Sequence, residues 1–259
     1  MNQNIPKLML TLCAVIILSF YGLSQEKHSG EHKATHWSYK GETGPLHWAD
    51  LNQEYRGCGS GKSQTPIDIN KTYKSDLDKL KFSYSEQPLS IINNGHTIQV
   101  NLNAGNTIMI DEEKYSLLQF HFHTPSEHTV SGKHFPMEMH LVHKNSEGEL
   151  GVVGLFFVKG RKNLELQKII DNLPSEINKV KSVNSVKIDP ANFLPYKTQY
   201  YYYSGSLTTP PCTEGVIWVV LKHPVEASAE QINALKKVMS ENARPIMPLN
   251  KRFVLESAQ

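Results

Sequence analysis

The sequence predicts a mainly β (α+β) protein, a single domain built on a large, mostly antiparallel sheet with peripheral helices. Six segments have the alternation or β-branched content of strands, whereas only two have a helical period. Because these strands do not alternate with helices along the chain, a parallel βαβ architecture is disfavoured. The length of 259 residues, 39% of them hydrophobic, fits one domain with a sizeable core. The net charge of +2 is too small to indicate a nucleic-acid partner.

The strands are predicted, in order, over 90–100, 107–110, 115–124, 137–143, 150–158 and 216–221. Asn93-Asn94-Gly95 predicts a turn or bulge inside the first of them. Apolar residues recur at helical spacing over 163–173, which Pro174 ends, and over 229–241.

The N-terminus is expected to be a secretory signal peptide. Lys7 precedes an apolar run over 8–23, and small residues place the cleavage after Ser24. The alternatives are a membrane anchor or a buried helix, but the run is short for a full membrane span. We therefore expect residues 1–24 to be removed, 25–35 to form a polar segment and 36–259 to form the domain. The mature chain would then be periplasmic or secreted, without a stable membrane span.

Removal of the leader takes Cys13 with it and leaves Cys58 and Cys212. In an exported protein such a pair is typical of a disulfide. The bridge would close a loop of about 150 residues, for which the chain-entropy account gives about 5 kcal/mol. It would also fix the loop before Cys212 to the N-terminal region. The alternative is two unrelated buried thiols.

The segment 119–123 carries the main functional pattern. Side chains alternate between the two faces of a strand, so His121 and His123 are expected on one face. Leu118, Phe120 and Phe122 are expected on the other face. A lone histidine in a strand is usually a packed residue, but two buried rings side by side are costly unless a metal binds them.

A third histidine, His140, follows 17 residues after His123. A neighbouring strand with Glu138, His140 and Val142 on one face would bring it alongside the pair. Three neutral imidazoles without a fourth protein ligand are typical of a catalytic zinc site. The spacing alone leaves open whether the two strands are adjacent.

Several segments together resemble the α-class carbonic anhydrases over roughly residues 35–255. They are HWSY at 36–39, GPLHW at 44–48, QTPID at 64–68, NNGH at 93–96, QFHFH at 119–123, SEHT at 126–129, EMHLVH at 138–143, SLTTPP at 206–211 and NARP at 242–245. The resemblance implies a large twisted sheet and one Zn²⁺ per chain. It also implies the reversible hydration of carbon dioxide to bicarbonate and a proton by attack of zinc-bound hydroxide.

The resemblance gives His121, His123 and His140 the role of zinc ligands. It implies that Gln119 bonds the first ligand and that Glu138 stands in the same relation to His140. The alternative for Glu138 is an ordinary solvated strand residue. For carbonic anhydrase itself, such a site lowers the pKa of the bound water to about 7.

The resemblance also implies that Thr208 accepts the hydroxide's hydrogen and donates its own to Glu127, which orients the nucleophile. Taken alone, Thr208 is a turn residue and Glu127 a surface charge. Thr209 is expected to help hold bicarbonate. The remaining substrate-binding residues implied, which would otherwise be ordinary core, are Val142, Val152, Leu207 and Trp218.

His96 matches the family's proton shuttle, a histidine that titrates near neutral pH. Without the family it would be a turn histidine. Tyr39, Asn94 and Gln99 match positions that order the intervening waters, although Gln99 replaces the asparagine common in animal members.

The chain resembles the bacterial branch, because the segment 123–127 is short and lacks a tryptophan. Two function classes follow: an active zinc lyase, or a binding module that keeps the fold without catalysis. The sequence contains all three zinc histidines as well as Glu127 and Thr208, which favours the active enzyme over the binding module. Ester hydrolysis is a weaker alternative. The expected partner is the small-molecule substrate, carbon dioxide or bicarbonate, and the chain is expected to be a monomer or homodimer.

Overall fold

The structure is a computed structural model that describes residues 36–258. The signal peptide predicted over 1–24 and the polar segment 25–35 lie outside the described residues. Among the described residues there is no helix long and apolar enough to cross a membrane.

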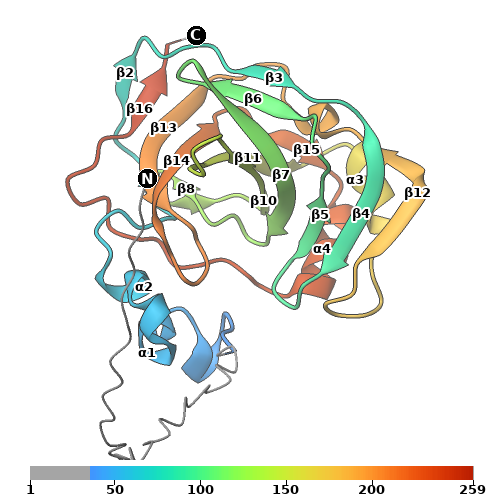
Figure 1. Cartoon of the computed structure of the whole chain (residues 1–259), viewed down its shortest axis with the longest axis horizontal. Helices are drawn as coiled ribbons and strands as arrows, with labels where there is room; N and C mark the ends of the chain where they lie inside the picture. Colours follow the sequence, from blue (N-terminus) through green and yellow to red (C-terminus); the bar gives the residue numbers. More distant parts are fainter. Residues whose placement is uncertain (1–35, 259) are drawn as a thin grey trace, which may run out of the picture. The chain divides into compact units, whose positions relative to one another are not determined.

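The described chain is mostly strands with few helices (Figure 1). The short 3-10 helices are η1 (Gly41–Thr43), η2 (Gln53–Tyr55) and η3 (Pro190–Phe193), and the α-helices are α1 (Trp48–Leu51), α2 (Gly57–Ser60), α3 (Leu164–Ile170) and α4 (Ala229–Met239). The strands are β1 (Asp68–Ile69), β2 (Tyr73–Ser75), β3 (Lys81–Ser83), β4 (Gln87–Asn93), β5 (Ile98–Asn101), β6 (Thr107–Ile110), β7 (Glu113–His123), β8 (Thr129–Val130), β9 (Lys133–His134), β10 (Met137–Lys144), β11 (Leu150–Lys159), β12 (Lys181–Ile188), β13 (Tyr200–Ser206), β14 (Glu214–Leu221), β15 (Val225–Ala227) and β16 (Leu255–Ser257).

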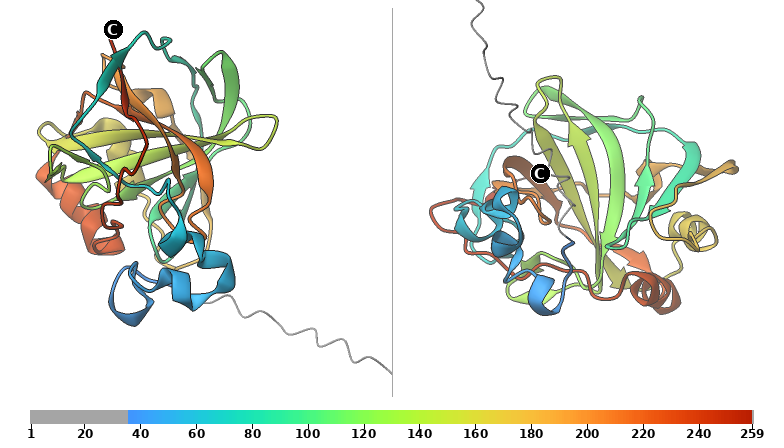
Figure 2. Two further views of the ribbon diagram at one scale, coloured as in Figure 1. Left: turned by 90° about the vertical axis from the view of Figure 1, so that its left-hand side faces the viewer. Right: turned by 60° about the horizontal axis from the view of Figure 1, so that its bottom comes forward.

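Thirteen strands form one sheet, with the order β12-β4-β5-β7-β10-β11-β14-β13-β16-β2 along its main path. Most neighbours are antiparallel, whereas β14 and β15 run parallel to β11, and β2 runs parallel to β16. Figure 2 shows the twist of this sheet from two further sides. The predicted fold class, a single mainly β domain with peripheral helices, is confirmed.

The first predicted strand is a hairpin. Strands β4 and β5 pair antiparallel, and the turn between them contains Gly95 with a φ of +84°. This left-handed conformation suits glycine, which has no Cβ to clash. The Asn93-Asn94-Gly95 motif therefore marks a reversal of the chain.

Strand β7 contains a bulge that changes which side chains share a face. Val142 pairs with Gln119 and the next residue, His143, pairs with Leu117, so Leu118 has no partner on β10. Leu118 is 42% exposed, whereas Phe120 and Phe122 are fully buried. The prediction that Leu118 shares a face with these two phenylalanines is wrong, because the extra residue reverses the alternation.

The two faces of the central strands support two apolar clusters. On β10, Met139 and Leu141 face a core that also contains Leu235 of α4 and Ile169 of α3. The opposite face contributes Val142 to a second cluster, whose larger members include Trp218, Tyr203 and Phe156. Strand β10 is therefore buried on both faces, and the polar residues that it carries must find partners inside the protein.

The predicted disulfide is present. Cys58 on α2 and Cys212 are joined by an S–S bond across 154 positions of the chain. The peptide groups beside it are also held, because Arg244 Nη2 donates to the carbonyl oxygen of Cys58 and Gln64 Nε2 donates to that of Cys212. The bridge thus fixes the loop that contains Thr208 to the N-terminal helices.

We expect the double variant Cys58→Ser, Cys212→Ser to lose about 2–5 kcal/mol in free energy of unfolding, because the open chain gains loop entropy when it unfolds. Urea denaturation followed by tryptophan fluorescence measures the loss. Wild-type protein kept under reductant is the control and should show the same lowering. An unchanged midpoint in both samples would contradict the expectation.

Candidate metal centre

Strands β7 and β10 bring the three predicted histidines together. Their antiparallel register places His140 opposite His121 and Glu138 opposite His123. The ring centroids lie 5.0 Å apart for His121 and His123, 5.4 Å for His121 and His140, and 4.5 Å for His123 and His140. One nitrogen from each ring lies within 4.8 Å of the others. The adjacency that spacing left open is therefore provided by this strand pair.

Each of these rings uses one nitrogen to donate a hydrogen bond away from the cluster. His121 Nδ1 donates to Gln119 Oε1 at 2.8 Å, His123 Nδ1 to the carbonyl oxygen of Asn242 at 2.8 Å, and His140 Nε2 to Glu138 Oε1 at 2.9 Å. The other nitrogens carry the lone pairs. His123 Nε2 is buried and has no hydrogen-bond partner among the described residues. Such an atom is costly unless something binds it.

The surroundings of His121 and His123 favour the neutral form of these two rings. Burial and the neighbouring His123 and His140 hold the pKa of His121 well below its usual value. Burial likewise lowers the pKa of His123, although Glu127 opposes this effect. Three neutral imidazoles are the donor set of a catalytic zinc site, so the residues present fit a zinc ion.

Glu138 anchors the third ligand within a buried network. It accepts from His140, from the backbone N–H of His128 and from His128 Nδ1, the last at 2.7 Å. Burial alone would raise the pKa of Glu138, but His128 and His140 hold it well below its usual value. Tyr203 Oη donates to His128 Nε2 at 2.6 Å. Because His128, Glu138 and His140 satisfy one another, this trio is a support for the ligand and not a second metal site.

Gly154 makes room for this network, which sequence reasoning did not foresee. It pairs with His140 across β10 and β11, and a Cβ at this position would lie 3.0 Å from Glu138 Oε1. A glycine inside a strand often indicates such a close approach.

Glu127 lies at the edge of the histidine cluster and is fully buried. Its Oε1 accepts from the backbone N–H of Arg244 at 2.9 Å. Its Oε2 lies 3.6 Å from His123 Nε2 and 3.8 Å from His140 Nδ1, and has no hydrogen-bond partner among the described residues. Thr208 is also buried, but no hydrogen bond joins it to Glu127 in the described part of the chain. Glu127 therefore presents an open acceptor beside the three histidines.

The predicted apolar wall is continuous with the ligands. One register row crosses the sheet through Gln119, Val142, Val152 and Trp218, next to the row of His121 and His140. The last three belong to one apolar cluster, against which Leu207 packs. Trp218 Nε1 donates to the carbonyl oxygen of Ser206, so the same indole fixes the start of the loop with Leu207, Thr208 and Thr209. Thr209 is half-buried on this loop.

His96 lies in the β4–β5 turn and stacks on Trp37, with centroids 3.7 Å apart and an interplanar angle of 6°. Burial and His36 lower its pKa. Asn94 Oδ1 accepts from the backbone N–H groups of His96 and Thr97, so this oxygen stabilises the turn.

The two other predicted water-ordering residues lie on different elements. Gln99 pairs with His121 across β5 and β7, and its Nε2 donates to Asn101 Oδ1 at 2.6 Å. Tyr39 packs edge-on against the ring of Trp37, and burial raises its pKa well above the usual value.

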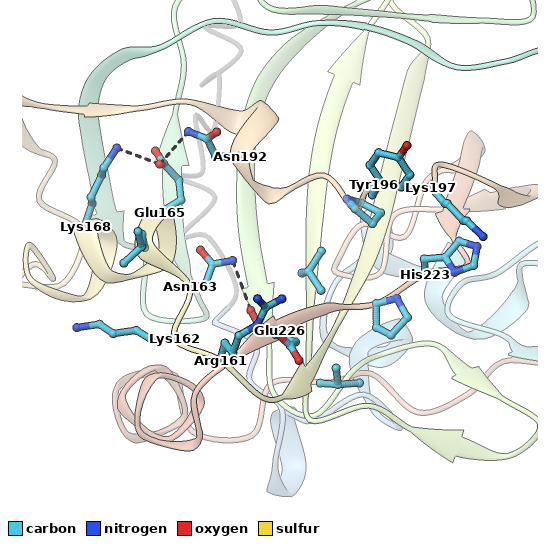
Figure 3. A pocket seen from close by; sticks show the side chains of 15 residues that line it. Arg161, Lys162, Asn163, Glu165, Lys168, Asn192, Tyr196, Lys197, His223 and Glu226 are labelled. Atoms are coloured by element: carbon cyan, nitrogen blue, oxygen red, sulfur yellow. Dashed lines mark hydrogen bonds and ion pairs between the residues drawn. The ribbon is translucent and has the colours of Figure 1, made fainter.

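A pocket of about 1140 Å³ lies at the start of α3 and beside β15 (Figure 3). Four of its charged lining residues form two ion pairs: Arg161 with Glu226 at 2.6 Å, and Lys168 with Glu165 at 2.9 Å. Among the described residues, the groups able to hold a metal consist of side chains from β7 and β10 together with His128, and none of them lines this pocket. This pocket is therefore not the candidate metal centre.

The chain is similar to known proteins in sequence and in structure. The family model described as eukaryotic-type carbonic anhydrase matches residues 43–258. A carbonic anhydrase of Klebsiella pneumoniae is 46% identical over 226 residues, which cover 86% of this chain and 92% of the relative. The α-carbonic anhydrase of Thermovibrio ammonificans, solved with the inhibitor sulfanilamide, superposes with a TM-score of 0.83 at 46% identity, over 85% of this chain and 99% of that one. The Photobacterium profundum α-carbonic anhydrase gives 0.81 at 45% identity, over 85% and 100%.

Proposed function

Since the chain belongs to the eukaryotic-type carbonic anhydrase family, whose reaction is carbon dioxide hydration, we propose that His121, His123 and His140 hold its catalytic zinc ion. The observation that carries this proposal is the unpartnered, buried Nε2 of His123, which lies in a cluster of three inward-facing nitrogens. When bound, zinc with three neutral imidazoles lowers the pKa of its water to about 7, a value established for carbonic anhydrases.

The residues around the metal would orient the reactants. Thr208 accepts the hydrogen of the attacking oxygen and donates its own hydrogen to Glu127, which aims a lone pair at the substrate carbon. The open Oε2 of Glu127 supports this role, because it is an acceptor without a donor. Gln119 and Glu138 fix the ring orientation of His121 and His140.

The substrate would lie against the apolar wall beside the metal. Val142, Val152, Leu207 and Trp218 exclude water from the side on which carbon dioxide approaches. Thr209 holds bicarbonate after the reaction. The wall's continuity with the histidine row of the sheet supports this placement.

The decisive experiment is a stopped-flow carbon dioxide hydration assay on protein of measured zinc content. We expect activity to scale with bound zinc, to disappear after chelation and to return when zinc is added. A sulfonamide should inhibit the zinc-loaded protein. Equal activity in the metal-free protein would contradict the proposal.

His96 would move the proton from the site to solvent, through waters ordered by Tyr39, Asn94 and Gln99. Its place in a turn at the protein surface and its lowered pKa support proton release from the ring. We expect His96→Ala to lower kcat in weak buffer by about ten-fold or more, within the range of general acid–base effects. Added imidazole should restore the rate, since it replaces the missing base. A variant as fast as wild type in weak buffer would exclude His96 as the main shuttle.

The protein would work outside the cytoplasm, in the periplasm or after secretion. The disulfide supports this location, because such bonds persist in oxidising compartments. N-terminal sequencing of exported protein tests it, and the expected first residue is Gln25, after removal of 1–24.

A further inference from the structure

Asn242 is a fully buried residue on the irregular segment that follows α4. The segment leaves the helix through Ser240, whose φ of +61° is in the left-handed region, and it belongs to no helix or strand among the described residues. The backbone carbonyl of Asn242 accepts the hydrogen bond from His123 Nδ1. The orientation of one candidate zinc ligand therefore depends on what holds Asn242 in place.

The side chain of Asn242 grips the end of β7 on both sides of His123. Its Oδ1 accepts from the backbone N–H of Thr124 at 2.8 Å, and its Nδ2 donates to the carbonyl oxygen of Phe122 at 2.9 Å. The backbone N–H of Asn242 also donates to the carbonyl oxygen of Thr124, and Thr124 Oγ1 donates to that of Ser240. Because His123 lies between Phe122 and Thr124, these bonds fix the ligand's backbone as well as its ring.

The same amide group also holds the β4–β5 turn. Asn242 Nδ2 donates to the carbonyl oxygen of His96 at 3.0 Å, so it bonds the turn and β7 at once. Thr97 joins these two segments at the same point, since its Oγ1 donates to the carbonyl oxygen of Phe122 at 2.6 Å. One side chain therefore connects the strand of a candidate zinc ligand with the turn of the candidate proton shuttle.

Only an amide can make these three bonds at this position. The two carbonyl oxygens need donors and the N–H of Thr124 needs an acceptor, whereas a carboxylate has no donor and an apolar side chain has neither. Each group left unpaired in this buried place would be costly. The partners lie 118, 120 and 146 positions away in sequence, so the side chain joins distant segments and does not merely close its own turn.

We propose that the side chain of Asn242 is a positioning residue for carbon dioxide hydration, which holds the zinc ligand His123 and the turn of His96 in one fixed arrangement. It acts through these two histidines and takes no part in the reaction itself. Loss of its donors would release both the carbonyl that orients His123 and the turn that carries His96. The inference rests on the proposed zinc centre and on the proposed role of His96.

The test uses the variant Asn242→Asp. The new side chain has the same size and keeps an acceptor for Thr124, but it places an oxygen where Nδ2 now donates to two carbonyl oxygens. Asn145→Asp is the matched control, because Asn145 is also buried and its amide is fully bonded within the β10–β11 connection and to Glu113. Thermal unfolding shows whether the variants fold. If Asn242→Asp does not, Asn242→Ala replaces it, since alanine puts no oxygen against the carbonyls.

Two measurements follow the two histidines. The first is the rate at which zinc-loaded protein loses its metal to a chelator, which we expect to rise about 10- to 100-fold in Asn242→Asp, the usual effect of losing a ligand's support. The second is kcat of the fully zinc-loaded protein in weak buffer. We expect a fall of about three-fold or more, smaller than the effect of removing an acid–base residue, and added imidazole should restore kcat. Asn145→Asp should match wild type in both measurements.

The outcomes separate this inference from the proposed function. If zinc loss stays at the wild-type rate, or if kcat in weak buffer is unchanged or does not respond to imidazole, Asn242 does not connect the two histidines and the inference is overturned. Equal effects in Asn145→Asp would overturn it too, because they would reflect a general loss of stability. A wild-type protein that binds no zinc, or a His96→Ala variant as fast as wild type, would instead overturn the proposed function itself.

Discussion

The His121→Ala variant is expected to lose its zinc ion and its carbon dioxide hydration activity. The substitution removes one of three nitrogen donors and leaves Gln119 Oε1 without the ring that donates to it. A catalytic zinc site rests on three protein ligands, and two do not hold the ion firmly. Loss of the metal removes several kcal/mol of transition-state stabilisation, so we expect activity to fall by about 10³-fold or more.

Zinc content by metal analysis and stopped-flow hydration measure the two losses together. His47→Ala removes an exposed imidazole from another part of the chain and should keep one zinc per chain. A His121→Ala protein that retained one zinc and full activity would refute the ligand assignment. A thermal unfolding curve on the metal-free proteins shows whether the variant is folded.

The face shared by His121 and His123 was predictable because alternation along a strand is a local rule. The position of His140 was not, since strand pairing depends on contacts distant in sequence. The segment between β7 and β10 includes the short strands β8 and β9, and spacing does not reveal how it returns. The bulge at Leu118 was also hidden, because nothing in an apolar run indicates where one residue is skipped.

Strands β13 and β12 were not predicted from the sequence, because neither shows a clear alternation of apolar and polar residues. The physical reason differs between the two strands. Strand β13 begins with four tyrosines, of which Tyr203 is buried and Tyr201 is half-buried, so apolar and polar positions do not alternate. Strand β12 lies at an end of the main path of the sheet and most of its residues are exposed, so it lacks a hydrophobic stripe. A strand is predicted from its residue pattern when one face is buried and the other is exposed, and neither of these strands has such a regular division.

The groups that accept hydrogen bonds from the histidines, or lie behind them, were the part of the site that was hardest to predict from the sequence. The partner of His123 is the backbone carbonyl of Asn242, which lies 119 positions away in sequence. A backbone acceptor has no residue-type preference that a sequence would display. Tyr203 behind His128 likewise depends on where β13 lies, and so the network follows from the fold.

The Glu127→Gln variant is expected to keep its zinc but to lose about 100-fold in kcat/KM, about 2.7 kcal/mol, the size of a misorientation effect. The amide oxygen can still accept from the backbone N–H of Arg244, as Oε1 does now. The amide nitrogen replaces the open acceptor Oε2, and it offers hydrogens where an acceptor stood. Thr208 then has no acceptor for its own hydrogen, and the lone pair of the nucleophile is no longer fixed.

A matched control removes a different buried carboxylate. Glu165 on α3 is buried and bonded to Asn192 and Lys168, away from the histidines. Glu165→Gln should lower stability but leave kcat/KM unchanged in the folded protein. If Glu127→Gln kept wild-type kcat/KM with full zinc, Glu127 would not orient the nucleophile.

A double-mutant cycle with Thr208→Ala distinguishes orientation through Thr208 from a direct electrostatic effect of Glu127. If Thr208 acts only when Glu127 accepts its hydrogen, each single variant breaks the same chain of hydrogen bonds. The double variant should then be about as slow as either single variant. If the loss of kcat/KM in the double variant equalled the product of the two single losses, Glu127 would act independently of Thr208. It would then act through the nearby ring nitrogens of His123 and His140, which lie 3.6 and 3.8 Å from its Oε2. The coupling between the two residues is thus the quantity that decides how the open carboxylate oxygen contributes to catalysis.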